Sequence, residues 1–289
     1  MALILPSGPS WAYFSDNLTI GDNHVDSGVS VTAGANNTKG NVVTAMSALS
    51  HDVEYLRIGV HGYSGSAVNS STLIDIMIDY AGGTSWETDP LIPNLAAGFT
   101  SWAAVDYNTA TGGVTHWYDF PLWIPAGASL GARAQTAHTS DITTGGVVIQ
   151  ARGGNKNPAS WWCGQRVTAI GIDTANSIGE LVPTASAPSF GAWTNVGSAL
   201  AADARAVQAM MQSDSDFSAQ NAAVYGQIGI SSTQIGPNFV KATSSYEAGT
   251  WLPTGPIFID IPAGTQLQAR ATREAGATAD VDIAIYAVH

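Results

Sequence analysis

The sequence predicts an all-β chain made of two tandem jelly-roll-like β-sandwich domains that arose by an internal duplication. Three observations predict this fold: a strand–corner–strand motif that occurs twice, apolar residues that recur with a period of two, and a composition suited to short strands. The 31 glycines and the 11% of charged residues are typical of many strands joined by turns, not of long surface helices.

The duplicated motif is an Ile-Pro-Ala-Gly corner, followed by a strand in which Leu, Ala and Ala alternate with other residues. It begins at Ile124 and again at Ile261, 137 residues later. Proline fixes φ and glycine tolerates positive φ, so the corner predicts a sharp turn between two strands. Earlier matches, such as Gly28 with Gly179, are 151 residues apart. The first repeat therefore carries about 14 extra residues (151 − 137) between the early and late matches.

These offsets predict a first domain over residues 1–156 and a second over residues 157–289, divided in the polar run 153–158. The surplus residues are expected in a long aromatic-rich insertion near 82–117. The apolar stripes are one-sided, so two sheets packed face to face are expected to fill a separate interior in each repeat.

Alternation of apolar and other residues marks individual strands, as over residues 73–80 and 281–288. Residues 198–213 have a composition that favours a helix. They align, however, with a segment in which Leu, Ile and Val alternate strictly over residues 56–60. Because duplicated segments share a fold, we predict a strand over 198–213 as well.

Charge and composition exclude several classes of partner. The net charge of −12, with only three lysines, argues against a nucleic-acid surface and against an anionic membrane surface. No apolar run approaches the roughly twenty residues of a membrane-spanning helix, and the N-terminal run lacks the basic leader of a signal peptide. We therefore expect synthesis and folding in a cytoplasm. The single cysteine, Cys163, excludes an intrachain disulfide and is expected to be a small buried hydrophobe.

No constellation for catalysis or metal binding is evident. None of the six histidines has a partner at metal-ligand spacing, and the pair His51-Asp52 has no accompanying nucleophile motif. Residues 62–65 lack the nucleophile-elbow pattern. Asp75 and Asp79 lie on one strand face, roughly 13 Å apart and too far to share a metal, so a solvated outer face is expected. We expect no catalytic residue, no metal site, no cofactor and no enzymatic activity.

The candidate contact residues are aromatic and basic. Aromatic residues gather in or beside the insertion, with three interpretations open: a small satellite core under a long loop, a protein interface, or stacking on sugar faces. Arg133 and Arg270 hold equivalent outward positions. Each is expected to bridge to a carboxylate on the neighbouring strand, and a repeated subunit contact is the alternative. The aromatic candidates are Trp86, Phe99, Trp102, Tyr107 and Trp117.

Three short motifs carry a resemblance to a known class of proteins. They are VTAGANNTKG at residues 31–40, GIDTANSIG at residues 171–179 and the repeated I-P-A-G-x-x-L-x-A-R-A. Together they resemble segments of structural proteins of tailed bacteriophages. The resemblance implies a non-enzymatic β-sandwich component of the virion, on the head surface, the tail or the fibres, and it carries no catalytic residues to this chain.

The functional expectation is a capsid decoration or cement protein on the head surface of a tailed phage, located in the virion. The alternatives are a tail-fibre or receptor-binding protein and a carbohydrate-binding module. The expected partners are other virion proteins, namely the major capsid protein or tail proteins, and further copies of this chain in a homo-oligomer. A host glycan is a further candidate ligand, whereas nucleic acid and membrane are not expected.

Overall fold

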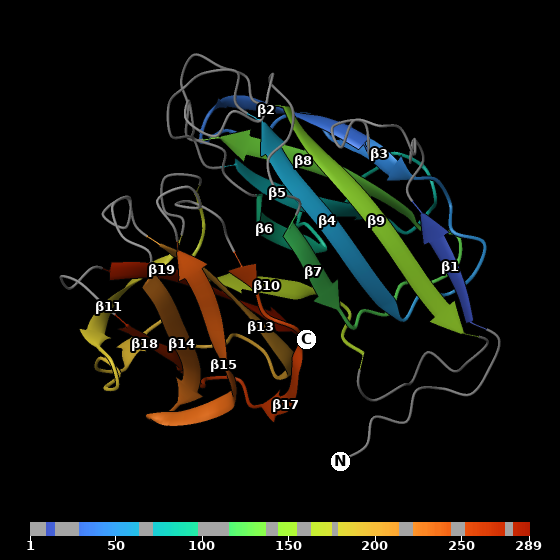
Figure 1. The fold of residues 1–289 in the computed structure, drawn as a ribbon. Helices are drawn as coiled ribbons and strands as arrows, with labels where there is room; N and C mark the ends of the chain where they lie inside the picture. Colours follow the sequence, from blue (N-terminus) through green and yellow to red (C-terminus); the bar gives the residue numbers. More distant parts are fainter. Residues whose placement is uncertain are drawn as a thin grey trace.

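The structure is a computed structural model, and the strands of its two repeats form two separate β-sandwiches (Figure 1). The predicted fold class is confirmed: the chain consists of two tandem jelly-roll-like β-sandwich domains, with no helix among the residues that the structure describes. Those residues are 10–14, 29–63, 72–97, 116–136, 144–154, 163–174, 179–213, 222–243, 252–274 and 280–289. The predicted domain boundary at 156/157 lies outside them.

The first repeat contains nine strands among its described residues. They are β1 (Ser10–Phe14), β2 (Val29–Asn36), β3 (Val43–Met46), β4 (Tyr55–Tyr63), β5 (Thr72–Asp79), β6 (Ile92–Ala97), β7 (His116–Phe120), β8 (Ser129–Thr136) and β9 (Thr144–Gly154).

The second repeat contains ten strands among its described residues. They are β10 (Val167–Ile170), β11 (Glu180–Ser186), β12 (Thr194–Asn195), β13 (Ala204–Ser213), β14 (Ala222–Ile230), β15 (Thr233–Thr243), β16 (Leu252–Pro253), β17 (Ile257–Ile261), β18 (Leu267–Arg273) and β19 (Asp280–Val288).

In each repeat a single shared strand joins the two sheets. The hydrogen-bonded order is β6-β5-β8-β2-β9-β4-β7 in the first repeat and β15-β14-β18-β11-β19-β13-β16 in the second. Strand β2 pairs in parallel with β8 and antiparallel with β9, and β11 does the same with β18 and β19. The two orders match strand for strand, as a duplication requires. Each sandwich has an open side between its end strands: β6 and β7 in the first repeat, and β15 and β16–β17 in the second.

Matching hydrogen bonds hold the repeated corner in both repeats. The glycines have positive φ, 89° at Gly127 and 81° at Gly264, which disfavours any residue with a Cβ. An aspartate carboxylate accepts a hydrogen bond from the corner alanine N–H at 2.8 Å, and a leucine carbonyl accepts one from the glycine N–H at 2.7 Å. The pairs are Asp52–Ala126 and Leu49–Gly127 in the first repeat, and Asp203–Ala263 and Leu200–Gly264 in the second.

The individual strand predictions are confirmed where the structure describes them. Residues 73–80 and 281–288 correspond to β5 and β19, and the strand predicted over 198–213 is β13, beginning at Ala204. Strand β6 lies inside the segment predicted as an insertion. Its counterpart in the strand order is β15, so the extra residues of the first repeat lie on both sides of β6.

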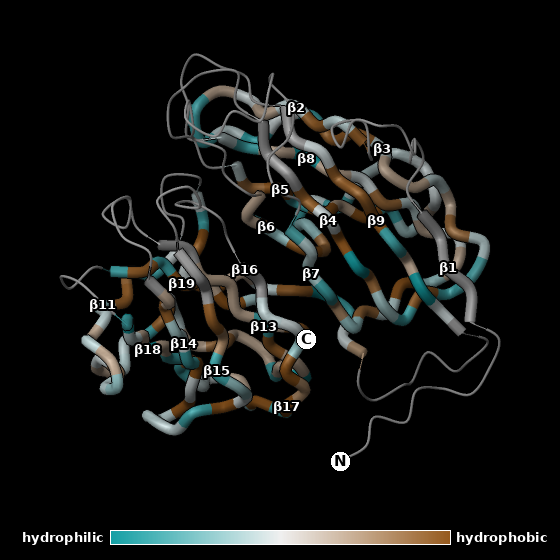
Figure 2. Tube along the Cα trace, in the orientation of Figure 1, coloured by the Kyte–Doolittle hydropathy of each residue, from teal (hydrophilic) through white to brown (hydrophobic). Residues whose placement is uncertain are grey.

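The second repeat fills an interior of its own, whereas the interior of the first repeat continues into the second. Hydrophobic and hydrophilic positions alternate along many strands in Figure 2. Strands β13 and β19 are apolar on both faces. One face, including Val207 and Ile285, fills the second interior. The other, including Met210 and Tyr286, is buried in the same cluster as the core of the first repeat. The expectation of two separate interiors is therefore wrong for the first repeat.

Candidate binding surfaces

The tyrosine Tyr286 of β19 closes the open side of the first repeat. Its ring meets Tyr118 and Phe120 of β7 edge-on, with centroids 5.4 Å and 6.1 Å apart. Its hydroxyl donates to the Asn94 carbonyl of β6 at 2.8 Å and accepts from the Ala96 N–H at 3.3 Å. Burial raises the pKa of Tyr286 above its ordinary value. One phenol thus joins both end strands of the first sandwich to the second repeat.

Polar contacts fix the two repeats around this ring. The side-chain amide of Asn94 donates to the carbonyls of Ile172 and Asp173, at 3.2 Å and 3.3 Å. Gln208 of β13 accepts from the Asp119 N–H at 3.3 Å and donates to the Thr254 carbonyl. These polar groups of the interface are therefore paired, which an apolar contact needs if burial is to stabilise it.

Arg133 bridges to a carboxylate on the neighbouring strand, as the sequence predicted. Its Nε lies 2.9 Å from Oδ2 of Asp75 in β5. Asp75 is only 1% exposed, and its Oδ1 accepts from Lys39 at 2.7 Å and from the Asn94 N–H at 2.9 Å. The expectation of a solvated Asp75 is wrong, because two cations and a backbone amide replace water around this carboxylate. Burial lowers the pKa of Lys39, against the opposing effect of Asp75.

Asp79 is buried as well, which corrects the second half of the same expectation. Its carboxylate accepts hydrogen bonds from the backbone N–H groups of Ala81, Gly83 and Ser85, at 2.8–2.9 Å. These bonds lower the pKa of Asp79. Asp79 therefore stabilises the turn that follows β5, and its side chain is not exposed to solvent.

Arg270 has no carboxylate partner among the described residues, so the ion pair predicted for it is wrong. Its Nε donates to Oε1 of Gln227 at 2.7 Å. Gln227 takes the register position of Asp75, because Asp75 pairs with Arg133 and Gln227 with Arg270. The guanidinium lies over two rings, Phe190 and Trp193, at 5.0 Å and 4.4 Å from their centroids. In the second repeat, cation–π contacts take the place of the ion pair.

Side-chain amides gather on the same face of the second repeat. Asn238 Oδ1 accepts from both Gln227 and Gln234 at 2.8 Å, and Gln268 donates to Asn195 at 2.9 Å. These contacts place a row of amides beside Arg270. Amides, a guanidinium and aromatic rings together are groups that hydrogen-bond and stack on sugars.

The aromatic candidates separate into three groups. Trp86 is half-buried, and its ring lies so close to Gly131 of β8 that a Cβ there would come within 2.9 Å of it. Trp117 of β7 is half-buried under Arg57, whose guanidinium lies 4.9 Å from the ring centroid. The remaining three candidates, Phe99, Trp102 and Tyr107, lie outside the described residues.

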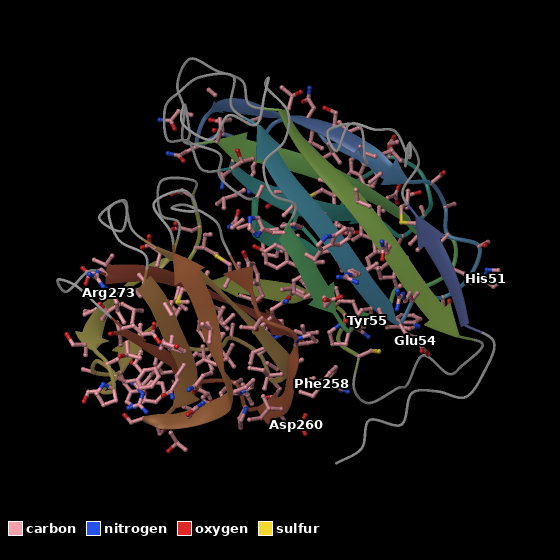
Figure 3. All side chains as sticks on the ribbon, in the orientation of Figure 1. His51, Glu54, Tyr55, Phe258, Asp260 and Arg273 are labelled. Carbon is pink, nitrogen blue, oxygen red and sulfur yellow. The ribbon has the colours of Figure 1, made fainter. Side chains whose placement is uncertain are left out.

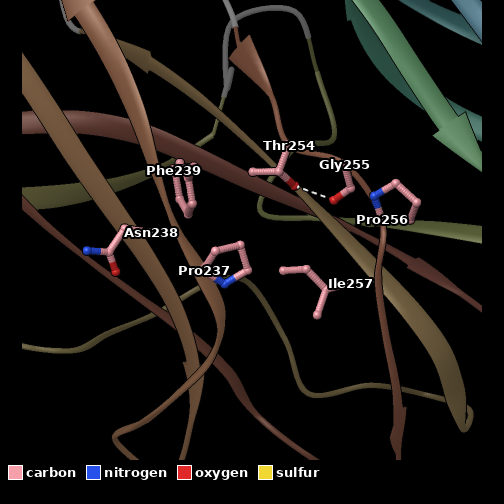
Figure 4. A pocket seen from close by; sticks show the side chains of 7 residues that line it. All are labelled: Pro237, Asn238, Phe239, Thr254, Gly255, Pro256 and Ile257. Carbon is pink, nitrogen blue, oxygen red and sulfur yellow. Dashed lines mark hydrogen bonds between the residues drawn. The ribbon is translucent and has the colours of Figure 1, made fainter. Parts of the chain in front are cut away.

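A hollow of about 370 Å³ lies at the open side of the second repeat (Figure 4). It is mostly apolar and lies between β15 and the segment that leads into β17. The lining residues are Pro237, Asn238, Phe239, Thr254, Gly255, Pro256 and Ile257. Two exposed hydrophobic side chains lie on the same strands, Val240 on β15 and Phe258 on β17, at 43% and 41% exposure. Figure 3 shows Phe258 and Asp260 at the outer edge of this repeat.

Within the described part of the chain, no cluster of three or more His, Cys, Asp or Glu side chains is arranged to hold a metal ion. The same residues contain no helix long and apolar enough to cross a membrane. Cys163 is buried, as predicted, and its thiol donates to the Glu54 carbonyl at 3.3 Å.

The inter-repeat contact and the hollow are the functional features that sequence reasoning missed. A signal for the contact was present at the end of the chain, where Ala284, Tyr286 and Val288 make the second face of β19 apolar. A strand that is apolar on both faces is typical of double burial. The sequence carries no comparable signal for the hollow, because the hollow depends on a side chain that the first repeat has and the second repeat lacks at an equivalent position.

No protein-family model matches the sequence, and no curated protein matches it. Among solved structures, the chain is similar to PNGF-II, with a TM-score of 0.38 and 9% identity over 98% of this chain and 65% of that one. The chain thus spans slightly less than two thirds of the length of PNGF-II.

Two viral proteins are also similar. A chain of the Sulfolobus turreted icosahedral virus has a TM-score of 0.38 and 9% identity, over 97% of this chain and 90% of that one. The major capsid protein P2 of bacteriophage PM2 has a TM-score of 0.30 and 7% identity, over 90% of this chain and 97% of that one. All these TM-scores lie below 0.5, so the likenesses say nothing about what this chain does.

Proposed function

We propose that this chain is a non-enzymatic structural component of a tailed-phage virion, acting as a decoration or cement protein on the outer surface of the head. The observation that carries the proposal is the contact between the repeats. Two sandwiches that share one buried cluster and a hydrogen-bonded clamp form a body of fixed spacing. Such a body is suited to bridging two neighbouring positions on a lattice.

The sequence supports the same role. The three motifs at residues 31–40, 171–179 and in the repeated corner resemble those of tailed-phage structural proteins. The partner is then the major capsid protein, with other copies of this chain as neighbours in a symmetric arrangement. A net charge of −12 disfavours direct contact with packaged nucleic acid, which suits the outside of the shell.

The test uses virions produced from the genome that encodes this chain. We expect mass spectrometry of purified particles to find the chain in a fixed ratio to the major capsid protein. We also expect the purified chain to bind, to saturation, shells made without it. Absence of the chain from purified virions, or failure to bind such shells, would remove the proposal.

A second candidate function is glycan binding, either in a receptor-binding device of the tail or in a carbohydrate-binding module. It is favoured by Arg270 between Phe190 and Trp193, beside the row of amides. Binding to an array of host-surface glycans that is lost in Trp193→Ala would support it. Silence on the array, combined with tight binding to capsid shells, would exclude it.

A further inference from the structure

The open sides of the two sandwiches are built from the same register positions. In β6, Leu95 pairs with Ile74, and in β15, Phe239 pairs with Gly226. In each case this is the residue pair directly next to the irregularity in the ladder. The run Pro93-Asn94-Leu95 therefore corresponds to Pro237-Asn238-Phe239. In the first repeat the Asn94 carbonyl accepts from the Tyr286 hydroxyl, and in the second repeat all three residues of the run line the hollow.

The opposite wall corresponds in the same way. Phe120 pairs with Leu56, and Ile257 pairs with Val207, which is 151 residues after Leu56. Tyr118 pairs with Ile58, and the carbonyl of Ala209, the counterpart of Ile58, accepts from the Thr254 N–H at 2.7 Å, so Thr254 and Gly255 take the place of Tyr118. The hollow thus holds the position at which Tyr286 lies in the first repeat, and it also lacks the ring of Tyr118.

We propose that this hollow is a socket for a tyrosine presented by a β-strand of another protein. The occupied counterpart shows the chemistry that such a position accepts: a phenol ring packed edge-on, with its hydroxyl bonded to the backbone of the edge strand. In the second repeat the edge strand is β15, whose backbone carbonyl groups on that side can accept from a phenol. Its wall of two apolar side chains, Phe239 and Ile257, and two prolines favours a ring over a polar group.

The socket is continuous with the contact between the repeats. Thr254 lines it, and the carbonyl of Thr254 accepts from the same Gln208 amide group whose oxygen binds Asp119 of the first repeat. Next to it, Val240 is 43% exposed, whereas Ala96, at the corresponding position of the closed side, is fully buried. An apolar rim that is covered in one repeat and bare in the other indicates a surface built to be covered.

A second copy of this chain is a poor occupant, which is why we assign the socket to a different protein. The face with Tyr286 is already buried within the chain. Its counterpart on the first repeat is the face of β4 and β9, identified by the matching pairs of the two ladders. There, Gln150 takes the place of Tyr286 and Arg57 that of Gln208. The partner strand must instead carry a tyrosine among small apolar residues, as β19 does.

The principal test converts the first repeat into such a partner. The variant combines Tyr55→Ala, Arg57→Gln, Gln150→Tyr and Arg152→Val, which copies four positions of that face of β13 and β19 onto β4 and β9. We expect this variant to form end-to-end oligomers whose sedimentation coefficient rises with concentration, while the wild-type chain does not. Adding Val240→Lys should abolish the oligomers, because it places a charge on the exposed apolar rim, at the position that Ala96 holds beside Tyr286 in the first repeat. Replacing Gln150 by Phe instead of Tyr should weaken association roughly fivefold, through loss of one hydrogen bond.

If the variant with four substitutions does not fold, a second measurement tests the socket. With the wild-type chain, p-cresol should shift the amide resonances of Asn238, Phe239 and Gly255 in NMR spectra more strongly than toluene does, and Val240→Lys should weaken these shifts. Oligomers that persist with Val240→Lys, or p-cresol shifts elsewhere only, would overturn the socket. Wild-type self-association abolished by Val240→Lys would overturn the assignment to a different protein. None of these outcomes depends on the virion role, which the particle composition tests separately.

Discussion

The open sides of the two sandwiches have the same ladder positions and opposite surroundings. In the first repeat, Tyr286 fills the space between β6 and β7, and the polar groups around it are paired. In the second, the space between β15 and β17 is a hollow with Phe258 exposed at its edge.

The outer sheet faces differ in a parallel way. Arg133 is neutralised by a buried carboxylate, whereas Arg270 is held by an amide and two rings. The comparison teaches that after a duplication the same ladder positions can be closed by a contact within the chain in one copy and left open in the other.

The largest expected effect concerns the two arginine sites. Asp75→Ala leaves Lys39 and Arg133 without their carboxylate, and removing one partner of a buried ion pair costs about 3–5 kcal/mol. Gln227→Ala at the equivalent position removes a hydrogen bond between a charged guanidinium and a neutral amide and should cost less, about 1.5–3 kcal/mol. Urea unfolding of both variants measures the difference. Equal losses of stability would show that the two sites are held by the same forces.

Tyr286 gives the next comparison. Tyr286→Ala should lower the free energy of unfolding by about 3–5 kcal/mol, because it leaves a cavity in a core shared by both repeats. The matched control, Gln150→Ala at the equivalent position of β9, should change it by less than about 0.5 kcal/mol. If the Tyr286 variant unfolds like wild type, the ring does not join the repeats.

Alkaline pH should weaken the same contact. Burial raises the pKa of both Tyr118 and Tyr286, so each keeps its proton in the folded chain after it has ionised in the unfolded one. Stability should therefore fall as pH rises above about 10, by up to about 1.4 kcal/mol per pH unit for each tyrosine. The raised pKa values of Tyr55 and Tyr225 act in the same direction, and the lowered pKa of Lys39 acts in the opposite one.

Unfolding measured from pH 8 to pH 11 checks this sign. Tyr286→Phe serves as the control and should reduce the slope. A stability that stays constant across this range, or rises, would contradict the proposed burial of the two hydroxyls.

The smallest expected effect tests the cation–π pair. Trp193→Ala removes one of the two rings over Arg270, and a partly exposed contact of this kind contributes about 0.5–1 kcal/mol. Val42→Ala, at the corresponding position of the first repeat, removes no cation–π contact and serves as its control. Thermal unfolding of both variants is the measurement, and an equal shift in Tm would mean that the ring only covers apolar surface.

The sequence predicts the repeated fold well, because each copy of the duplicated pattern can be checked against the other. The alternation over residues 56–60 identified β13 as a strand, although its own composition favours a helix. The corner motif likewise predicted the turns at Gly127 and Gly264. These features depend on local chemistry and on comparison of two copies of one pattern.

The candidate site could be predicted much less completely. Asp75 looks solvated in the sequence because the cations that bury it lie 36 and 58 positions away along the chain. Phe190 takes the place of Lys39, so the equivalence of Arg133 and Arg270 in sequence does not extend to their partners. The hollow arises because Thr254 and Gly255 stand where the first repeat has Tyr118, and this difference acquires meaning only once the strands are placed together.

The most direct test of the account is a cryo-electron microscopy map of virions produced from the genome that encodes this chain. We predict both sandwiches on the outside of the head in the fixed arrangement of Figure 1, with a tyrosine of a neighbouring protein seated between β15 and β17. Particles that lack the chain, or a map in which the two sandwiches take variable relative orientations with this hollow open to solvent, would contradict it.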